Sequence, residues 1–166
     1  DGQGKCTKSF VAGDSAGGGL SLGVTLSLKD DGSQLPDAVM SLCPWAELDP
    51  VSESYETNAS NDPYISRDAI SAFRDLYIEN ESDLKDPYAS PVYGDYDGFP
   101  PLLIQVGGRE VLLDDSLKVA EKAKKSGCEV KLEVWDDMVH VFQGYAPFLP
   151  EANEALEAIA KFISNK

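Results

Sequence analysis

The segment Gly13-Asp14-Ser15-Ala16-Gly17 is the most informative part of the sequence about the fold. It joins an apolar run to a helical pattern through a serine flanked by glycines. Residues 9–12 are typical of a buried strand, and residues 16–28 predict a helix that Asp30-Asp31-Gly32 ends. A serine in G-x-S-x-G between a strand and a helix indicates a nucleophile elbow, a sharp turn that pushes the hydroxyl outward. The Ala16 N–H, at the helix N-terminus, would then point toward a developing oxyanion.

Other glycine-rich turns fit this segment less well. A phosphate-binding P-loop would end in G-K-S or G-K-T, and a dinucleotide-binding turn needs G-x-G-x-x-G; neither pattern occurs here. The letters G-D-S-A-G also resemble the serine turn of chymotrypsin-like proteases, but those enzymes place a histidine and an aspartate before the serine. No histidine precedes Ser15.

Strand-like and helix-like patterns alternate along the rest of the chain. Strands that alternate with helices predict crossover connections, so we expect an α/β fold with a mostly parallel sheet and flanking helices. The region from Glu47 to Pro101 is the loop-rich part. The expected strands are residues 9–13, 38–43, 102–106 and 129–135, and the expected later helices are residues 66–77, 114–126 and 150–163. The apolar face of the first of these helices comprises Ala69, Ile70, Phe73, Leu76 and Tyr77.

A serine nucleophile needs a base within hydrogen-bond reach and a third group that orients the base. His140 is the one histidine of the chain, and it follows the last expected strand. The acid is expected after the third strand, where Glu110 is the first candidate. Asp114 is the alternative acid, although its place at the start of a helix also suits a capping role, and Asp115 is a weaker third candidate.

Composition limits the partners and the compartment. The net charge of −15 argues against nucleic acid or an anionic membrane surface as a partner. The three cysteines are Cys6, Cys43 and Cys128. They are far apart in the sequence, so they form no metal-binding motif, and an odd number cannot all pair in disulfides. We therefore expect reduced thiols in a cytoplasmic protein. No apolar run is long enough for a membrane helix. We expect neither a metal nor a cofactor.

With these residues placed, the chain resembles the hormone-sensitive-lipase family of carboxylesterases, which have the α/β-hydrolase fold. The resemblance rests on five segments that together cover almost the whole chain. It implies Ser15 as nucleophile, His140 as base and Glu110 as acid, although the family's usual acid is aspartate. Val141 departs from the glycine that commonly follows the family's histidine. The five segments are residues 13–18, Pro44-Trp45, Asp62-Pro63, residues 107–115 and residues 138–142.

The family also carries an upstream H-G-G-G-type oxyanion loop and a cap, which this chain lacks. Residues 1–166 are therefore expected to form a partial domain, the C-terminal half of an α/β-hydrolase. The resemblance implies a serine esterase or lipase acting on short- to medium-chain carboxylic esters, weakened by that lack, with Asp14 and Trp45 at the substrate pocket. The alternatives are an inactive half-domain that self-associates through the exposed edge strand Ser9–Gly13 or complements an N-terminal half, and a serine peptidase or amidase.

Overall fold

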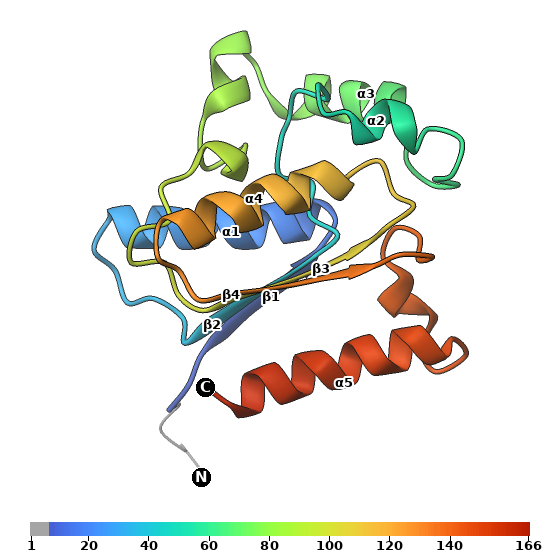
Figure 1. Cartoon of the computed structure of the whole chain (residues 1–166). Helices are drawn as coiled ribbons and strands as arrows, with labels where there is room; N and C mark the ends of the chain where they lie inside the picture. Colours follow the sequence, from blue (N-terminus) through green and yellow to red (C-terminus); the bar gives the residue numbers. More distant parts are fainter. Residues whose placement is uncertain (1–6) are drawn as a thin grey trace, which may run out of the picture.

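The protein, described by a computed structural model for residues 7–166, is a parallel four-stranded sheet between two layers of helices (Figure 1). The strands follow chain order, β1-β2-β3-β4, and each pairs with the next in parallel. The predicted α/β architecture is confirmed. The main elements are β1 Phe10–Asp14, α1 Ala16–Asp30, β2 Ala38–Leu42, α2 Ser54–Thr57, α3 Arg67–Tyr77, β3 Leu102–Gly107, α4 Leu113–Lys125, β4 Val130–Trp135 and α5 Pro150–Ser164. Short 3₁₀ turns span Glu81–Lys85, Pro91–Tyr93 and Phe142–Tyr145.

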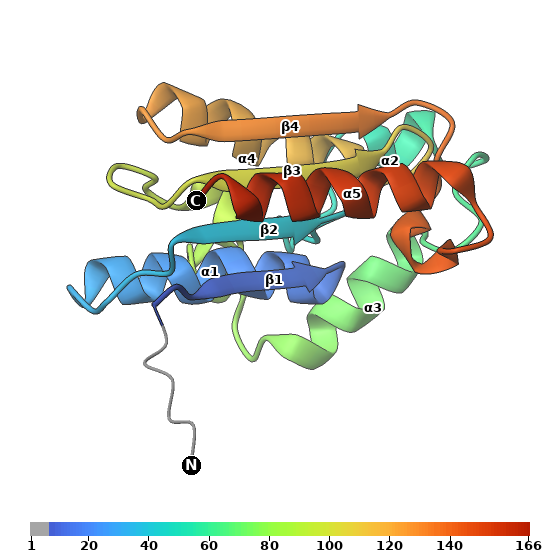
Figure 2. The ribbon, with the colours of Figure 1, turned by 90° about the horizontal axis from the view of Figure 1, so that it is seen from below.

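The two helical layers cover opposite faces of the sheet. Helices α1 and α4 lie on one face and α5 crosses the other (Figures 1 and 2). The two central strands therefore bury both faces: Val39 and Ile104 pack toward α1 and α4, whereas Met40 and Leu103 pack toward α5. This explains why β2 and β3 are mostly apolar, with Ser41 and Gln105 as their buried polar residues, since a strand covered on both sides needs no polar face.

Helix boundaries follow the expected signals. Helix α1 ends at Asp30, and Gly32 beyond it has φ 66°, a left-handed conformation that glycine adopts without steric cost. Gly127, with φ 83°, has the same role after α4. The Ser66 side chain caps α3 by accepting a hydrogen bond from the Ala69 N–H at 3.2 Å.

The apolar face of α3 differs from the expectation. Of its larger members only Ile70 is buried, whereas Phe73, Leu76 and Tyr77 are 54%, 86% and 60% exposed. The reason is the position of the helix: α3 lies beyond the carboxyl ends of the strands (Figure 2), and this face lines a cavity rather than the sheet core.

Strand β1 lies at one edge of the described sheet, with β2 as its neighbour, and β4 lies at the other edge (Figure 2). The edge position expected for the segment Ser9–Gly13 therefore holds for β1 within residues 7–166. The edge strand β4 is only half covered, and Val134 near its end is 40% exposed.

Candidate active site

The turn between β1 and α1 holds Ser15 in a backbone conformation that is rare for a serine. Its φ is 55° and its ψ is −122°, outside the ordinary regions for residues with a side chain. Three backbone hydrogen bonds fix it: Ser15 N–H donates to the Leu42 carbonyl at 2.9 Å, and the N–H groups of Gly19 and Trp45 donate to the Ser15 carbonyl at 3.1 and 3.0 Å. Strain of this kind persists only where the surroundings impose it, and it occurs most often at functional sites.

Two glycines make this turn possible through their lack of a side chain. A Cβ at Gly13 would lie 2.1 Å from the Gly17 carbonyl oxygen, and one at Gly19 would lie 2.0 Å from the Trp45 carbonyl oxygen. Gly17, the second flanking glycine of the G-x-S-x-G segment, does not have this role, because no described atom outside its own helical turn lies within 4 Å of a Cβ built there. The close approach occurs at Gly13 and Gly19 instead.

These contacts predict opposite effects for two substitutions in one helix. Gly19→Ala should lower the free energy of unfolding by about 1–3 kcal/mol, because the new methyl group meets a backbone carbonyl that cannot rotate away. Gly17→Ala should leave it unchanged or raise it by about 0.5–1 kcal/mol through reduced chain entropy. Urea denaturation of both variants checks this. Equal destabilisation by the two would show that the crowding at Gly19 is not the cause.

Three loops at the carboxyl ends of parallel strands bring the predicted polar residues together. His140 Nε2 lies 2.9 Å from Ser15 Oγ, and His140 Nδ1 lies 2.6 Å from Glu110 Oε2. Glu110 is fully buried and His140 is 8% exposed. Ser15 follows β1, Glu110 follows β3 and His140 follows β4. Because the strands are parallel, these residues, which are distant in sequence, all lie at the carboxyl ends of the strands.

Contacts that the sequence did not reveal hold the loop of Glu110. Glu110 Oε1 accepts a hydrogen bond from the Gly107 N–H at 2.7 Å, and the Glu110 carbonyl accepts one from Asn58 Nδ2 at 2.9 Å. Asp62 Oδ2 accepts from the Val111 N–H at 2.9 Å. Asp62-Pro63 was visible as a motif, but only the folded chain shows that its carboxylate supports the acid loop.

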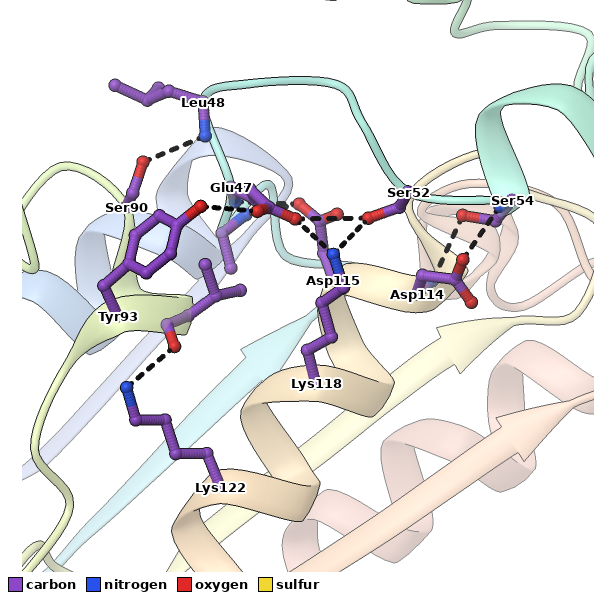
Figure 3. A network of polar contacts seen from close by, with 12 residues as sticks. Glu47, Leu48, Ser52, Ser54, Ser90, Tyr93, Asp114, Asp115, Lys118 and Lys122 are labelled. Carbon is purple, nitrogen blue, oxygen red and sulfur yellow. Dashed lines mark hydrogen bonds and ion pairs between the residues drawn. The ribbon is translucent and has the colours of Figure 1, made fainter. Parts of the chain in front are cut away.

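The alternative acid, Asp114, is engaged elsewhere (Figure 3). Its Oδ2 accepts a hydrogen bond from the Ser54 N–H at 2.8 Å, and its own N–H donates to Ser54 Oγ at 3.3 Å. Ser54 Oγ in turn donates to the Val111 carbonyl at 2.6 Å. The structure therefore brings Glu110 to His140, and it pairs Asp114 with the start of α2.

Asp115 fastens the loop after β2 to helix α4 (Figure 3). Its fully buried carboxylate accepts hydrogen bonds from the N–H groups of Ala46 and Glu47, both at 2.9 Å, through Oδ2. Glu47 itself accepts from Tyr93 Oη at 2.8 Å and from Lys118 Nζ. Burial raises the pKa of Asp115 to about 7, against the opposing effect of the two N–H groups. The same loop contains Trp45, whose backbone N–H donates a hydrogen bond to the Ser15 carbonyl.

Ala16 is the first residue of α1. The first N–H groups of a helix have no partner within the helix, and they carry the positive end of its dipole. This position suits the predicted role of the Ala16 N–H as an oxyanion donor.

An apolar cavity of about 570 Å³ extends from Ser15 between α1 and α3. Trp45, the predicted pocket residue, lines it and is held by a hydrogen bond from Nε1 to the Glu47 carbonyl at 3.0 Å. Asp14 lies outside this lining and is exposed at the end of β1, so the structure gives it no place in the cavity wall. The remaining wall is apolar and includes Leu20, Leu48, Ile65, Phe73 and Leu76.

Two further expectations concern the whole chain. None of the helices described within residues 7–166 is both long and apolar enough to cross a membrane. Cys43 and Cys128 are free thiols in this structure, and Cys6 lies outside the described residues.

Comparison with known proteins gives a consistent set of relatives. A family model described as an alpha/beta hydrolase fold matches residues 2–144. An acetyl-hydrolase of Streptomyces hygroscopicus is 39% identical over 92% of this chain and 51% of its own length, and an esterase of Acinetobacter venetianus is 36% identical over 94% and 52%. The chain thus spans about half the length of the curated relatives it matches.

Solved structures agree with this result. The crystal structure of an esterase from the bacterial hormone-sensitive lipase family matches with a TM-score of 0.89 and 43% identity, over 92% of this chain and 51% of that one. An esterase/lipase structure from an uncultured bacterium matches with a TM-score of 0.89 and 42% identity, over 94% and 52%. The chain belongs to the α/β-hydrolase fold family and, within it, to the hormone-sensitive-lipase family.

Proposed function

We propose that this protein hydrolyses carboxylic esters through a covalent acyl-serine intermediate. The observation that carries the proposal is the pair of contacts from Ser15 Oγ to His140 Nε2 at 2.9 Å and from His140 Nδ1 to Glu110 Oε2 at 2.6 Å. A nucleophile, a base and a carboxylate that orients the base are the three parts that serine acyl transfer requires. The names of the relatives, acetyl-hydrolase and esterase, support the same class of reaction.

In the proposed reaction, Ser15 Oγ attacks the ester carbonyl carbon while His140 Nε2 accepts the hydroxyl proton. The carbonyl oxygen gains the negative charge, which the Ala16 N–H and the N-terminus of α1 stabilise. His140 then protonates the leaving alkoxide as the carbon–oxygen bond breaks. A water molecule, deprotonated by His140, attacks the acyl-serine and releases the acid, which restores Ser15. Glu110 stabilises the imidazolium in both halves of the cycle.

The substrate class follows from the cavity beside Ser15. Its wall between α1 and α3 is apolar, and its volume of about 570 Å³ suits a short or medium hydrocarbon chain. Trp45 contributes an aromatic surface close to the nucleophile. We therefore propose esters with short- to medium-chain acyl groups as substrates, rather than charged or polymeric ones.

A non-catalytic role is the second candidate, and the edge position of β1 favours it. Within the described sheet β1 pairs with β2 on one side only, and an edge strand offers backbone N–H and C=O groups for pairing with another chain. Self-association through this strand, or pairing with a complementary half-domain, would bring the same residues into a larger sheet.

The partner and compartment are proposed from the sequence alone. The net charge of −15 favours a small uncharged ester over nucleic acid as partner. The three separated cysteines favour the reducing cytoplasm.

The test is hydrolysis of p-nitrophenyl acetate and p-nitrophenyl butyrate by the chain beside its Ser15→Ala variant. We expect release of p-nitrophenol that depends on Ser15, with a fall of about 10³-fold or more in the variant. Circular dichroism of the variant controls for folding. Equal rates for the two proteins would contradict the proposed nucleophile.

A further inference from the structure

A third buried side chain, Cys43, lies beside His140 and Glu110. The Cys43 sulfur, a Glu110 carboxylate oxygen and a His140 ring nitrogen all lie within 4.8 Å of one another, and all three residues are buried. Cys43 comes directly after β2, between the strands that deliver Ser15 and Glu110. The proposed hydrolysis does not use this thiol.

The three donor atoms have the chemistry of a zinc-type ligand set. Thiolate, imidazole and carboxylate are the three side-chain ligands that Zn²⁺ takes, at about 2.3 Å for sulfur and about 2.0–2.2 Å for nitrogen and oxygen. Such bond lengths place tetrahedral ligand atoms about 3.3–3.7 Å apart. The His140 Nδ1 to Glu110 Oε2 distance is 2.6 Å, so this pair must open by roughly 1 Å to admit an ion.

The backbone around the sulfur favours its charged form locally. The Val141 N–H donates to Cys43 Sγ at 3.3 Å. Cys43 has φ 47° and Val141 has φ 52°, left-handed values that are uncommon for residues with a side chain and outside the usual range for a β-branched one. Two strained residues therefore aim this N–H at the sulfur. Burial and the Glu110 charge nevertheless raise the pKa of the thiol, so without a cation it stays protonated.

We propose that Cys43, Glu110 and His140 form a binding site for one thiophilic divalent cation, Zn²⁺ or Cd²⁺, which inhibits the enzyme reversibly. On binding, the thiol releases its proton to solvent, the proton on His140 Nδ1 moves to Nε2, and the ion bonds to Sγ, Nδ1 and Oε2. Ser15 Oγ then faces a protonated Nε2 and loses its base. Inhibition rests on the proposed function, whereas binding does not.

Metal binding is tested separately from hydrolysis, in a full-length variant that carries Ser15→Ala, Cys6→Ser and Cys128→Ser. Cys43 is then the one cysteine left in the chain. Cd²⁺ is titrated into this variant. We expect ultraviolet thiolate-to-cadmium absorption that saturates at one ion per chain, with one proton released per ion. Affinity should rise with pH, because the ion displaces the thiol proton.

Two variants in the same background separate this site from binding by a lone thiol. Cys43→Ser should abolish the absorption, and His140→Gln should keep it but weaken the affinity by roughly tenfold or more, because a nitrogen ligand is lost. Circular dichroism shows that each variant is folded. Absence of saturable absorption in the single-thiol chain, or an affinity unchanged by His140→Gln, would overturn the site.

Inhibition is then measured on the chain with its native Ser15, with p-nitrophenyl butyrate as substrate. Zn²⁺ should abolish activity and a chelator should restore it, and Cys43→Ser should lower sensitivity to Zn²⁺ by roughly tenfold or more. Stoichiometric Cd²⁺ absorption without inhibition would overturn the inhibitory role alone. A chain that binds Cd²⁺ but is inactive without any metal would count against the proposed hydrolysis and not against the site.

Discussion

Glu110→Gln is expected to lower kcat for ester hydrolysis by about 10⁴-fold while leaving KM within a few-fold, because the amide no longer fixes the productive His140 tautomer. Glu110 Oε2 lies 2.6 Å from His140 Nδ1, and Oε1 accepts from the Gly107 N–H at 2.7 Å. An amide there can present its NH₂ to the ring, so that Nδ1 becomes the acceptor and Nε2 carries the proton. Ser15 then has no base. The measurement is kcat and KM with p-nitrophenyl butyrate across pH.

Asp114→Asn is the matched control, since it makes the same chemical change four residues later. Asp114 contacts Ser54 rather than His140, so the variant should keep kcat within a few-fold and lose at most about 1 kcal/mol of stability. The reverse pattern, with Asp114→Asn inactive and Glu110→Gln active, would assign the acid to Asp114 and contradict the geometry described above.

Asp115 is expected to lower the stability of the protein as pH rises. Its pKa in the folded state is about 7, against 3.8 for an ordinary aspartate, because the carboxyl is fully buried. Between these two values the folded protein binds a proton that the unfolded chain has lost, so the free energy of unfolding falls with increasing pH and levels off above about pH 7. From pH 5 to pH 8 the free energy of unfolding should fall by about 3 kcal/mol.

The isosteric variant Asp115→Asn isolates this effect. Its amide oxygen can still accept from the Ala46 and Glu47 N–H groups, but it does not titrate. Asp115 Oδ1 has no hydrogen-bond partner within the described residues, so the amide NH₂ would sit unpaired and add an offset that is independent of pH. Urea denaturation from pH 5 to pH 8 gives the difference between the two proteins. A difference that stays flat with pH would show that Asp115 has an ordinary pKa.

The sheet and the chain order of the site could be predicted from local signals. Apolar runs bounded by polar residues mark β2 and β3, and the glycine-flanked serine marks the turn after β1. Once the strands are known to be parallel, the residues that follow them are expected at the same end of the sheet, the carboxyl ends of the strands. This expectation brings His140 and Glu110 close to Ser15. Only one histidine was available, and this reduced the search for a base to a single residue.

The supporting contacts could not be predicted, because they join residues through folding rather than spacing. Asn58 donates a hydrogen bond to the Glu110 carbonyl from a turn that lies 52 positions earlier in the sequence. The apolar stripe of α3 is the same whether it faces a core or a cavity, so its periodicity did not reveal the exposure of Leu76. The proximity of Cys43 to His140 likewise depends on how the β2 and β4 loops converge.

A covalent acyl group on Ser15 would be detected most directly by the mass of the protein during the reaction. The chain is mixed with p-nitrophenyl acetate, quenched in acid within the burst of p-nitrophenol release, and digested for peptide mass analysis. We expect one added acetyl group on the peptide that contains Ser15, and none in His140→Ala under the same conditions. Acetyl groups spread over lysines, or equal labelling of the Ser15 peptide without His140, would rule out Ser15 as the nucleophile activated by His140.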